Sequence, residues 1–153
     1  MKRPLLISIL LMFVLHAFST ADNKPDFHSV FAKDGDGVFT ILRRYQLLHP
    51  CNLDKFYELN QLKEGDYLQE HKEYKLPVLI YKYNGKSIRS TLDIESWDKA
   101  IEIKKYNEDI LSKGLRQTHY SVSNILWVPY HLTGCLIEKG EEEPRTENIT
   151  NPE

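Results

Sequence analysis

The residues whose types and spacing most clearly suggest chemistry are two carboxylates in the segment DGDG at residues 34–37. Alternating carboxylates are typical of calcium-binding loops, in which about six to eight oxygen atoms surround the ion. With Asp34 in the first position, the twelfth position falls on Tyr45, and the frame that aligns a glycine ends at Arg43. Neither frame supplies enough oxygen ligands. The segment is therefore predicted to be a turn that leads into a helix, with Asp36 as the N-cap.

The histidines and cysteines show no spacing that is typical of catalysis. A zinc hydrolase needs about three protein ligands and a general base, but no H-x-x-x-H or H-x-x-E pattern occurs. The serines and cysteines likewise lie in no nucleophile motif. We therefore predict no catalytic residue, no metal ligand and no cofactor, with an enzyme as the alternative. Four aromatic residues could stack on sugars, but their spacing is more typical of core positions: Trp97, Tyr106, Trp127 and Tyr130.

The N-terminal segment, residues 1–21, is typical of a secretory signal peptide. Lys2 and Arg3 precede an apolar run at residues 5–18, and small residues end the segment at Ala21. The run is short for a membrane span. We expect an exported protein of the periplasm or cell envelope, with no stable membrane span after cleavage; an uncleaved N-terminal anchor is the alternative.

Charge and cysteine content narrow the possible partners. The formal net charge of the whole chain is −2, and the leader carries two positive charges, so the mature protein is more acidic. Nucleic-acid binding, which needs a basic face, is not expected. Export allows Cys51 and Cys135 to form a disulfide, and two free thiols are the alternative. We predict that the two Cα atoms lie within about 7 Å, which a bridge requires.

Hydrophobic periodicity predicts a β-α-α-β unit in the first half of the mature chain. The expected elements are a strand at residues 27–33, a helix from Val38 that ends at His49-Pro50, a helix from an Asn52 N-cap to Asn60, a loop, and a return strand from Tyr74 to Pro77. The unit therefore spans residues 27–77.

The second half, residues 78–137, is predicted to be a β-β-α-β extension packed on this unit. Asn84-Gly85 between β-rich runs is a strong hairpin signal. A long helix follows, with Asp93 as its N-cap and Gly114 just after its end, and residues 124–132 form a last strand. Residues 138–153 are acidic and are expected to be a disordered tail or a truncated linker. The fold class is α+β.

The first unit resembles a LysM module, a small fold that binds peptidoglycan and chitin. The family pattern is a strand, a Gly-Asp-Thr turn, an apolar pair, a basic-Tyr helix end, an Asn after the second helix and a Leu-x-x-Pro return strand. The residues that match it are Gly35, Asp36, Val38, Phe39, Ile41, Arg44, Tyr45, Leu59, Asn60, Leu68, Leu76 and Pro77. Gly37 stands where Thr is usual, and Glu70-His71 replaces a Pro-Gly turn.

A wider resemblance covers nearly the whole mature chain. Four segments are similar to the N-terminal region of exported N-acetylmuramoyl-L-alanine amidases of Bacteroidetes-type bacteria: CNLDKFYELN, YKLPVLIYKYNGKSIRS, KYNE and LWVPYHL. In that family a zinc amidase domain follows, whereas this chain stops at Glu153. The resemblance implies a non-catalytic peptidoglycan-binding module that acts in cell-wall targeting, with glycan strands and a separate or downstream amidase domain as partners. The alternatives are a truncated amidase and a periplasmic interaction protein without glycan binding.

In a unit of this kind, the first strand–helix turn and the loop after the second helix are expected to leave a shallow groove for N-acetylglucosamine-containing glycan. We call its two sides the first and second wall. The first wall consists of Asp34, Gly35, Asp36, Gly37 and Val38, and the second of Asn60, Gln61, Leu62 and Lys63. Glycines allow backbone amides to approach a sugar closely, and the Asn60 amide could bind N-acetyl groups. The same residues could instead serve only as turns and caps.

Overall fold

The computed structural model describes residues 25–135, and both the predicted signal peptide and the predicted acidic tail lie outside this range. Within it, six helices accompany a three-stranded antiparallel sheet, so the expected mixture of helices and antiparallel strands is confirmed. The elements in chain order are β1 (Asp26–Phe31), α1 (Val38–Arg44), α2 (Pro50–Asn60), β2 (Glu73–Lys82), α3 (Ile88–Leu92), α4 (Trp97–Ser112), α5 (Tyr120–Ser123), β3 (Ile125–Pro129) and α6 (Tyr130–Thr133).

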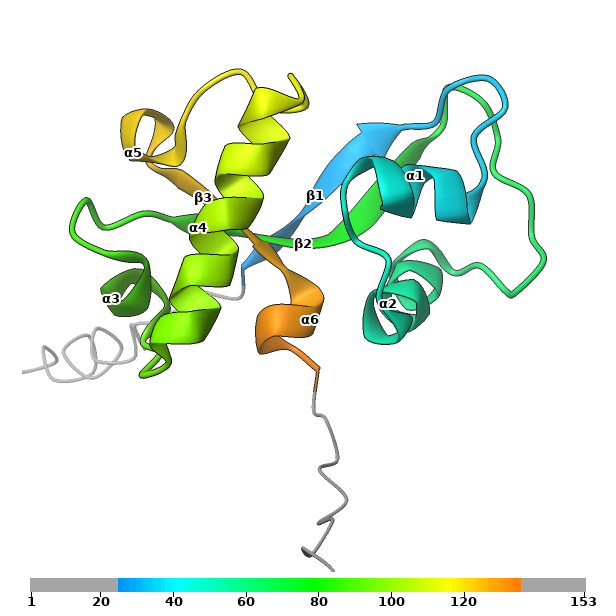
Figure 1. The fold of residues 1–153 in the computed structure, drawn as a ribbon. Helices are drawn as coiled ribbons and strands as arrows, with labels where there is room; N and C mark the ends of the chain where they lie inside the picture. Colours follow the sequence, from blue (N-terminus) through cyan, green and yellow to red (C-terminus); the bar gives the residue numbers. More distant parts are fainter. Residues whose placement is uncertain (1–24, 136–153) are drawn as a thin grey trace, which may run out of the picture.

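The sheet is organised around β2, which joins the two halves of the chain. It pairs with β1 from Glu73 to Ile80, as at Tyr74 opposite Val30, and its second half also pairs with β3, as at Ile80 opposite Trp127. The helices α1 and α2 lie at one end of β2, and α3, α4 and α5 surround the other end (Figure 1). The boundary that we expected between residues 77 and 78 falls in the middle of this strand.

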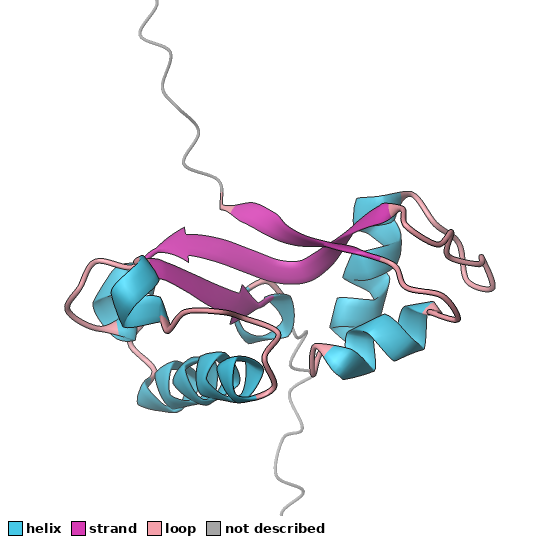
Figure 2. Ribbon diagram, turned by 90° about the horizontal axis from the view of Figure 1, so that it is seen from above, coloured by secondary structure: helices cyan, strands magenta, loops and turns pink. Residues whose placement is uncertain are grey.

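Two apolar clusters fill the space between the helices and the sheet. The first gathers α1 and α2 around the β1–β2 ladder, and the second joins α3, α4 and α5 to the β2–β3 ladder. Val78 belongs to the first cluster and its neighbour Leu79 to the second, and both are buried. Because successive residues of a strand point to opposite faces, the centre of β2 is covered on both sides. The helices gather toward the two ends of the sheet (Figure 2).

The start of α2 differs from the expectation. The first helix ends at Arg44, before His49-Pro50, and Pro50 opens α2 instead of closing α1. Proline suits the first helical position because the backbone N–H that it lacks would have no helical partner there. His49 is the N-cap and accepts a hydrogen bond from the backbone N of Cys51. The prediction of Asn52 as N-cap was wrong, and this residue is buried one turn into the helix.

The predicted hairpin at Asn84-Gly85 was also wrong. The Asn84 side chain accepts a hydrogen bond from the backbone N of Lys86, and Ser87 then caps α3 by accepting from Ser90 N. The chain therefore leaves the sheet here, because an asparagine turn followed by a serine N-cap starts a helix. Residues 86–92 form no second hairpin strand.

The boundaries of α4 and β3 differ in a similar way. Asp93 ends α3 in a left-handed conformation, and Ser96 is the N-cap of α4. Gly114 follows α4 with φ of +67°, as expected for a residue just after a helix. The last strand is shorter than predicted, since it ends at Pro129 and the chain continues into α6.

Candidate functional site

Part of the first wall of the predicted groove has a structural role. The Asp36 side chain is only 2% exposed; its carboxylate accepts from Lys33 N at 2.8 Å and pairs with Arg44. Burial would raise the pKa of Asp36, but these partners outweigh it and hold the pKa below its usual value. The predicted N-cap role is therefore wrong: Gly37 occupies that position, and Asp36 fastens the turn to α1. Val38 is buried and contributes to the core.

The rest of the first wall is accessible. Asp34 is exposed, and Gly35 has φ of +75°. A Cβ atom added to Gly35 or Gly37 would have no heavy atom within 4 Å, so the backbone on this side faces open space. The first wall thus offers its backbone and the Asp34 carboxylate to a ligand.

The Asn60 side chain in the second wall is bound to the fold. Its Nδ2 donates to Phe56 O at 2.8 Å and to Lys75 O at 2.9 Å, and its Oδ1 accepts from Lys75 N at 2.8 Å. Both donor hydrogens are used, so Asn60 attaches the end of α2 to the first half of β2. Leu62 packs against the first apolar cluster. Exposed side chains are left at Gln61 and Lys63.

The two walls belong to neighbouring loops. The backbone of Ala32 donates to Lys72 O and accepts from His71 N, which joins the loop after β1 to the loop before β2. Val38 and Leu62 contact the same apolar cluster. Four cavities within residues 25–135 lie elsewhere, and none of these four is lined by a residue of either wall.

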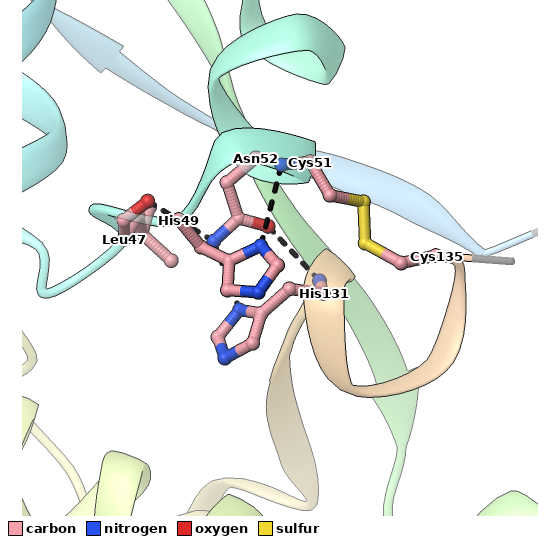
Figure 3. The surroundings of a disulfide bond; sticks show 6 residues. All are labelled: Leu47, His49, Cys51, Asn52, His131 and Cys135. Atoms are coloured by element: carbon pink, nitrogen blue, oxygen red, sulfur yellow. Dashed lines mark hydrogen bonds between the residues drawn. A yellow bond between two sulfur atoms is a disulfide. The ribbon is translucent and has the colours of Figure 1, made fainter. Parts of the chain in front are cut away.

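The only grouping of potential metal ligands found among the described residues is His49, Cys51 and Cys135, whose ligand atoms lie within 4.8 Å of one another. The two cysteines form a disulfide that joins α2 to the segment after α6 (Figure 3). Their Cα atoms are 6.2 Å apart, which confirms the predicted proximity. Because metal binding needs thiolates, the disulfide removes two of the three ligands.

A histidine pair lies next to this disulfide. His49 and His131 stack with ring centroids 4.7 Å apart (Figure 3). Asn52 accepts from His131 N at 2.9 Å, and its Nδ2 lies 2.9 Å from His131 Nδ1. Burial, with a smaller effect of His49, lowers the pKa of His131. These contacts dock α6 on α2.

A second buried polar group lies between α4 and β3. Asn107 is 1% exposed and bonds to both backbone groups of Trp127, and the Arg116 guanidinium donates to its Oδ1 at 2.8 Å. Burial lowers the pKa of Arg116. The guanidinium also donates to Thr118 O and to Ser123 Oγ. A further bond goes to Ile125 O, so this cation connects Asn107 to the residues before and at the start of β3.

Among the aromatic residues considered for sugar stacking, Tyr106 and Trp127 are buried as expected. Trp97 is not a core residue, since it is 67% exposed at the start of α4. The sequence pattern predicted a core position for Trp97, because Ala100 and Ile101 follow it at the three- and four-residue spacing of an apolar helix face. Ile101 is itself 59% exposed, so the stripe continues beyond the part of α4 that is covered.

Within residues 25–135, no helix combines the length and hydrophobicity that crossing a membrane requires. Comparison of the chain with protein-family models, with curated proteins and with solved structures found no match.

Proposed function

We propose that this protein is an exported, non-catalytic module that binds peptidoglycan glycan strands. The observation that carries the proposal is the β1-α1-α2-β2 unit, in which backbone bonds of Ala32 join the loop that contains the first wall to the end of the loop that begins with the second wall. This order of elements is the one that the LysM resemblance implies. The disulfide supports export, because such bonds persist in oxidising compartments.

The accessible parts of the two walls define how a glycan would bind. Gly35 and Gly37 leave backbone groups open to hydroxyl and N-acetyl groups of a sugar. Gln61 and Lys63 provide exposed side chains on the other loop. Asp36 and Asn60 do not contact the ligand in this proposal, because their polar atoms hold the loops in place. A surface this shallow gives weak affinity, micromolar to millimolar, or roughly −8 to −4 kcal/mol.

Sedimentation of the protein with purified peptidoglycan tests this proposal. The test variant is Gly37→Arg with Lys63→Glu, because Gly37 has free space and negative φ, and Lys63 is exposed. Its control is Gln117→Arg with Lys113→Glu, which makes the same charge change at exposed residues near the end of α4. We expect the control to sediment like the original protein and the test variant to remain in solution.

Equal sedimentation of both double variants would show that this surface is not the binding site. If the unaltered protein does not sediment, peptidoglycan binding is wrong, and a periplasmic interaction protein becomes the better description. Circular dichroism of each variant confirms that a loss of sedimentation does not come from unfolding.

A further inference from the structure

A cavity of about 260 Å³ lies at the other end of the molecule, between α3 and α4. Trp97 and Ile101, one turn apart on α4, form its exposed apolar side. Lys86, Arg89 and Lys104 form its charged side. No acidic residue lines it, although the chain as a whole carries a negative formal charge. An apolar surface beside three cations is the chemistry of a site for an anionic ligand that also has an apolar face.

Local folding brings these residues together. The Asn84 turn and the Ser87 cap start α3, and α3 packs against α4. As a result, the Arg89 guanidinium lies 4.5 Å from the centre of the Trp97 ring. At this distance the guanidinium and the indole attract each other as a cation–π pair, which places a positive charge beside the Trp97 ring.

The arginine has unused hydrogen-bonding capacity. Its Nε is buried and, among the described residues, has no hydrogen-bond partner. Buried polar atoms without a partner are uncommon in folded proteins and cost about 1–3 kcal/mol each. Among residues 25–135, the one ion pair made by a cation of this cavity joins Lys104 to Glu108 at 3.7 Å, and both side chains are about half exposed. Such pairs contribute little, so Lys104 is available to a ligand.

From these observations, we propose that the cavity between α3 and α4 binds an acidic sugar, with the pyranose ring against Trp97 and its carboxylate near Arg89 and Lys104. Arginine suits this role because its planar fork matches the geometry of a carboxylate. The cavity volume suits one sugar ring rather than a long segment of glycan. This inference rests on the proposed function for its choice of sugar: the lactyl group of N-acetylmuramic acid carries a carboxylate, which is free on glycan whose stem peptide has been removed, and N-acetylglucosamine lacks this group.

Titration of the ¹⁵N-labelled protein with free sugars, followed by NMR, tests the proposal directly. The chain has two tryptophans, one exposed and one buried, so the indole signal of Trp97 reports on the cavity. We expect N-acetylmuramic acid to shift this signal with a dissociation constant in the millimolar range. N-acetylglucosamine and sodium lactate, which carry the ring and the carboxylate separately, should each bind at least about tenfold more weakly, as expected for loss of one charge-assisted contact.

Two variants assign the effect to the cavity. Arg89→Gln removes the cation and should weaken binding of N-acetylmuramic acid about tenfold or more. Lys99→Gln removes a cation from the exposed surface of α4, outside the cavity, and should leave binding unchanged. Equal affinity for all three compounds, no shift of the Trp97 signal, or equal effects of the two variants would each overturn the proposal.

The result is independent of the sedimentation experiment. A protein that sediments with peptidoglycan but shows no Trp97 shift would refute the cavity proposal and leave the module function intact. A protein that binds N-acetylmuramic acid at Trp97 but does not sediment would have an acidic-sugar site and no affinity for the polymer.

Discussion

Replacement of Asn107 by alanine should destabilise the protein strongly, because this side chain serves both backbone polar groups of Trp127. Its Oδ1 accepts from Trp127 N at 3.1 Å, and its Nδ2 donates to Trp127 O at 2.7 Å. It also accepts from Arg116 at 2.8 Å and donates to Ile103 O at 2.8 Å. Alanine removes all four bonds and leaves their partners buried.

The four partners of Asn107 differ in how many hydrogen bonds they keep after the substitution. Ile103 O keeps its bond within α4, and Arg116 keeps its bonds to neighbouring groups. The N–H and C=O groups of Trp127 lose the partner that the helix supplied, and each such loss costs about 1–2 kcal/mol. Adding about 1 kcal/mol for the arginine bond gives an expected loss of about 3–5 kcal/mol. That is a large fraction of the 5–15 kcal/mol, roughly, that stabilises a typical domain.

Urea unfolding followed by far-UV circular dichroism measures this loss. Glu102→Ala is the control, because Glu102 is exposed on the same helix and should change the free energy of unfolding by less than about 0.5 kcal/mol. If Asn107→Ala costs less than about 1 kcal/mol, the side chain does not connect α4 to β3 in the way described here.

Three further predictions concern stability. Cys51→Ser with Cys135→Ser opens a loop of 84 residues and should lower the free energy of unfolding by about 3–4.5 kcal/mol in urea titrations; a loss below about 1 kcal/mol would contradict this. Burial, and to a smaller extent His49, lowers the pKa of His131 in the folded state, so the unfolded chain binds the extra proton first. Stability should therefore fall as the pH drops below about 6.5, with a smaller slope in His131→Gln, and equal slopes would refute this assignment. Asn60→Ala removes two bonds between α2 and β2 and one bond within α2 and should cost about 2–3 kcal/mol, measured in the same way; an unchanged midpoint would show that the amide does not support the fold.

The periodic parts of the fold could be predicted from the sequence. Ile41, Tyr106 and Ile110 lie in the core as their helical spacing indicates, whereas Trp97 and Ile101 of the same pattern are exposed. Strand structure on both sides of residue 77 was also expected, because β-branched and aromatic residues follow one another there, but as two strands instead of the single strand β2. These elements depend on local patterns of burial, which the order of residues records directly.

The hairpin error has a different origin. Asn84-Gly85 suits a tight turn between strands, and Asn84 with Ser87 equally suits a turn that starts a helix. The choice depends on where Ile88 is buried, and it is buried against α4 in the second apolar cluster. Since α4 begins several residues later in the chain, a short window of sequence does not contain the contact that decides between a strand and a helix.

The candidate site was harder to predict because an asparagine side chain suits both a structural role and the binding of a sugar. Asn60 bonds to both backbone groups of Lys75, Asn107 does the same for Trp127, and Asn52 bonds to the backbone N of His131. Each pair is far apart in sequence, so nothing near the asparagine indicates its partner. A side-chain amide offers one acceptor and two donors, which suits a backbone group as well as an N-acetyl sugar. Because the fold uses these amides, the proposed binding of a glycan would depend on groups that the fold leaves open: the glycine backbone of the first wall, the exposed side chains of the second, and the cations around Trp97.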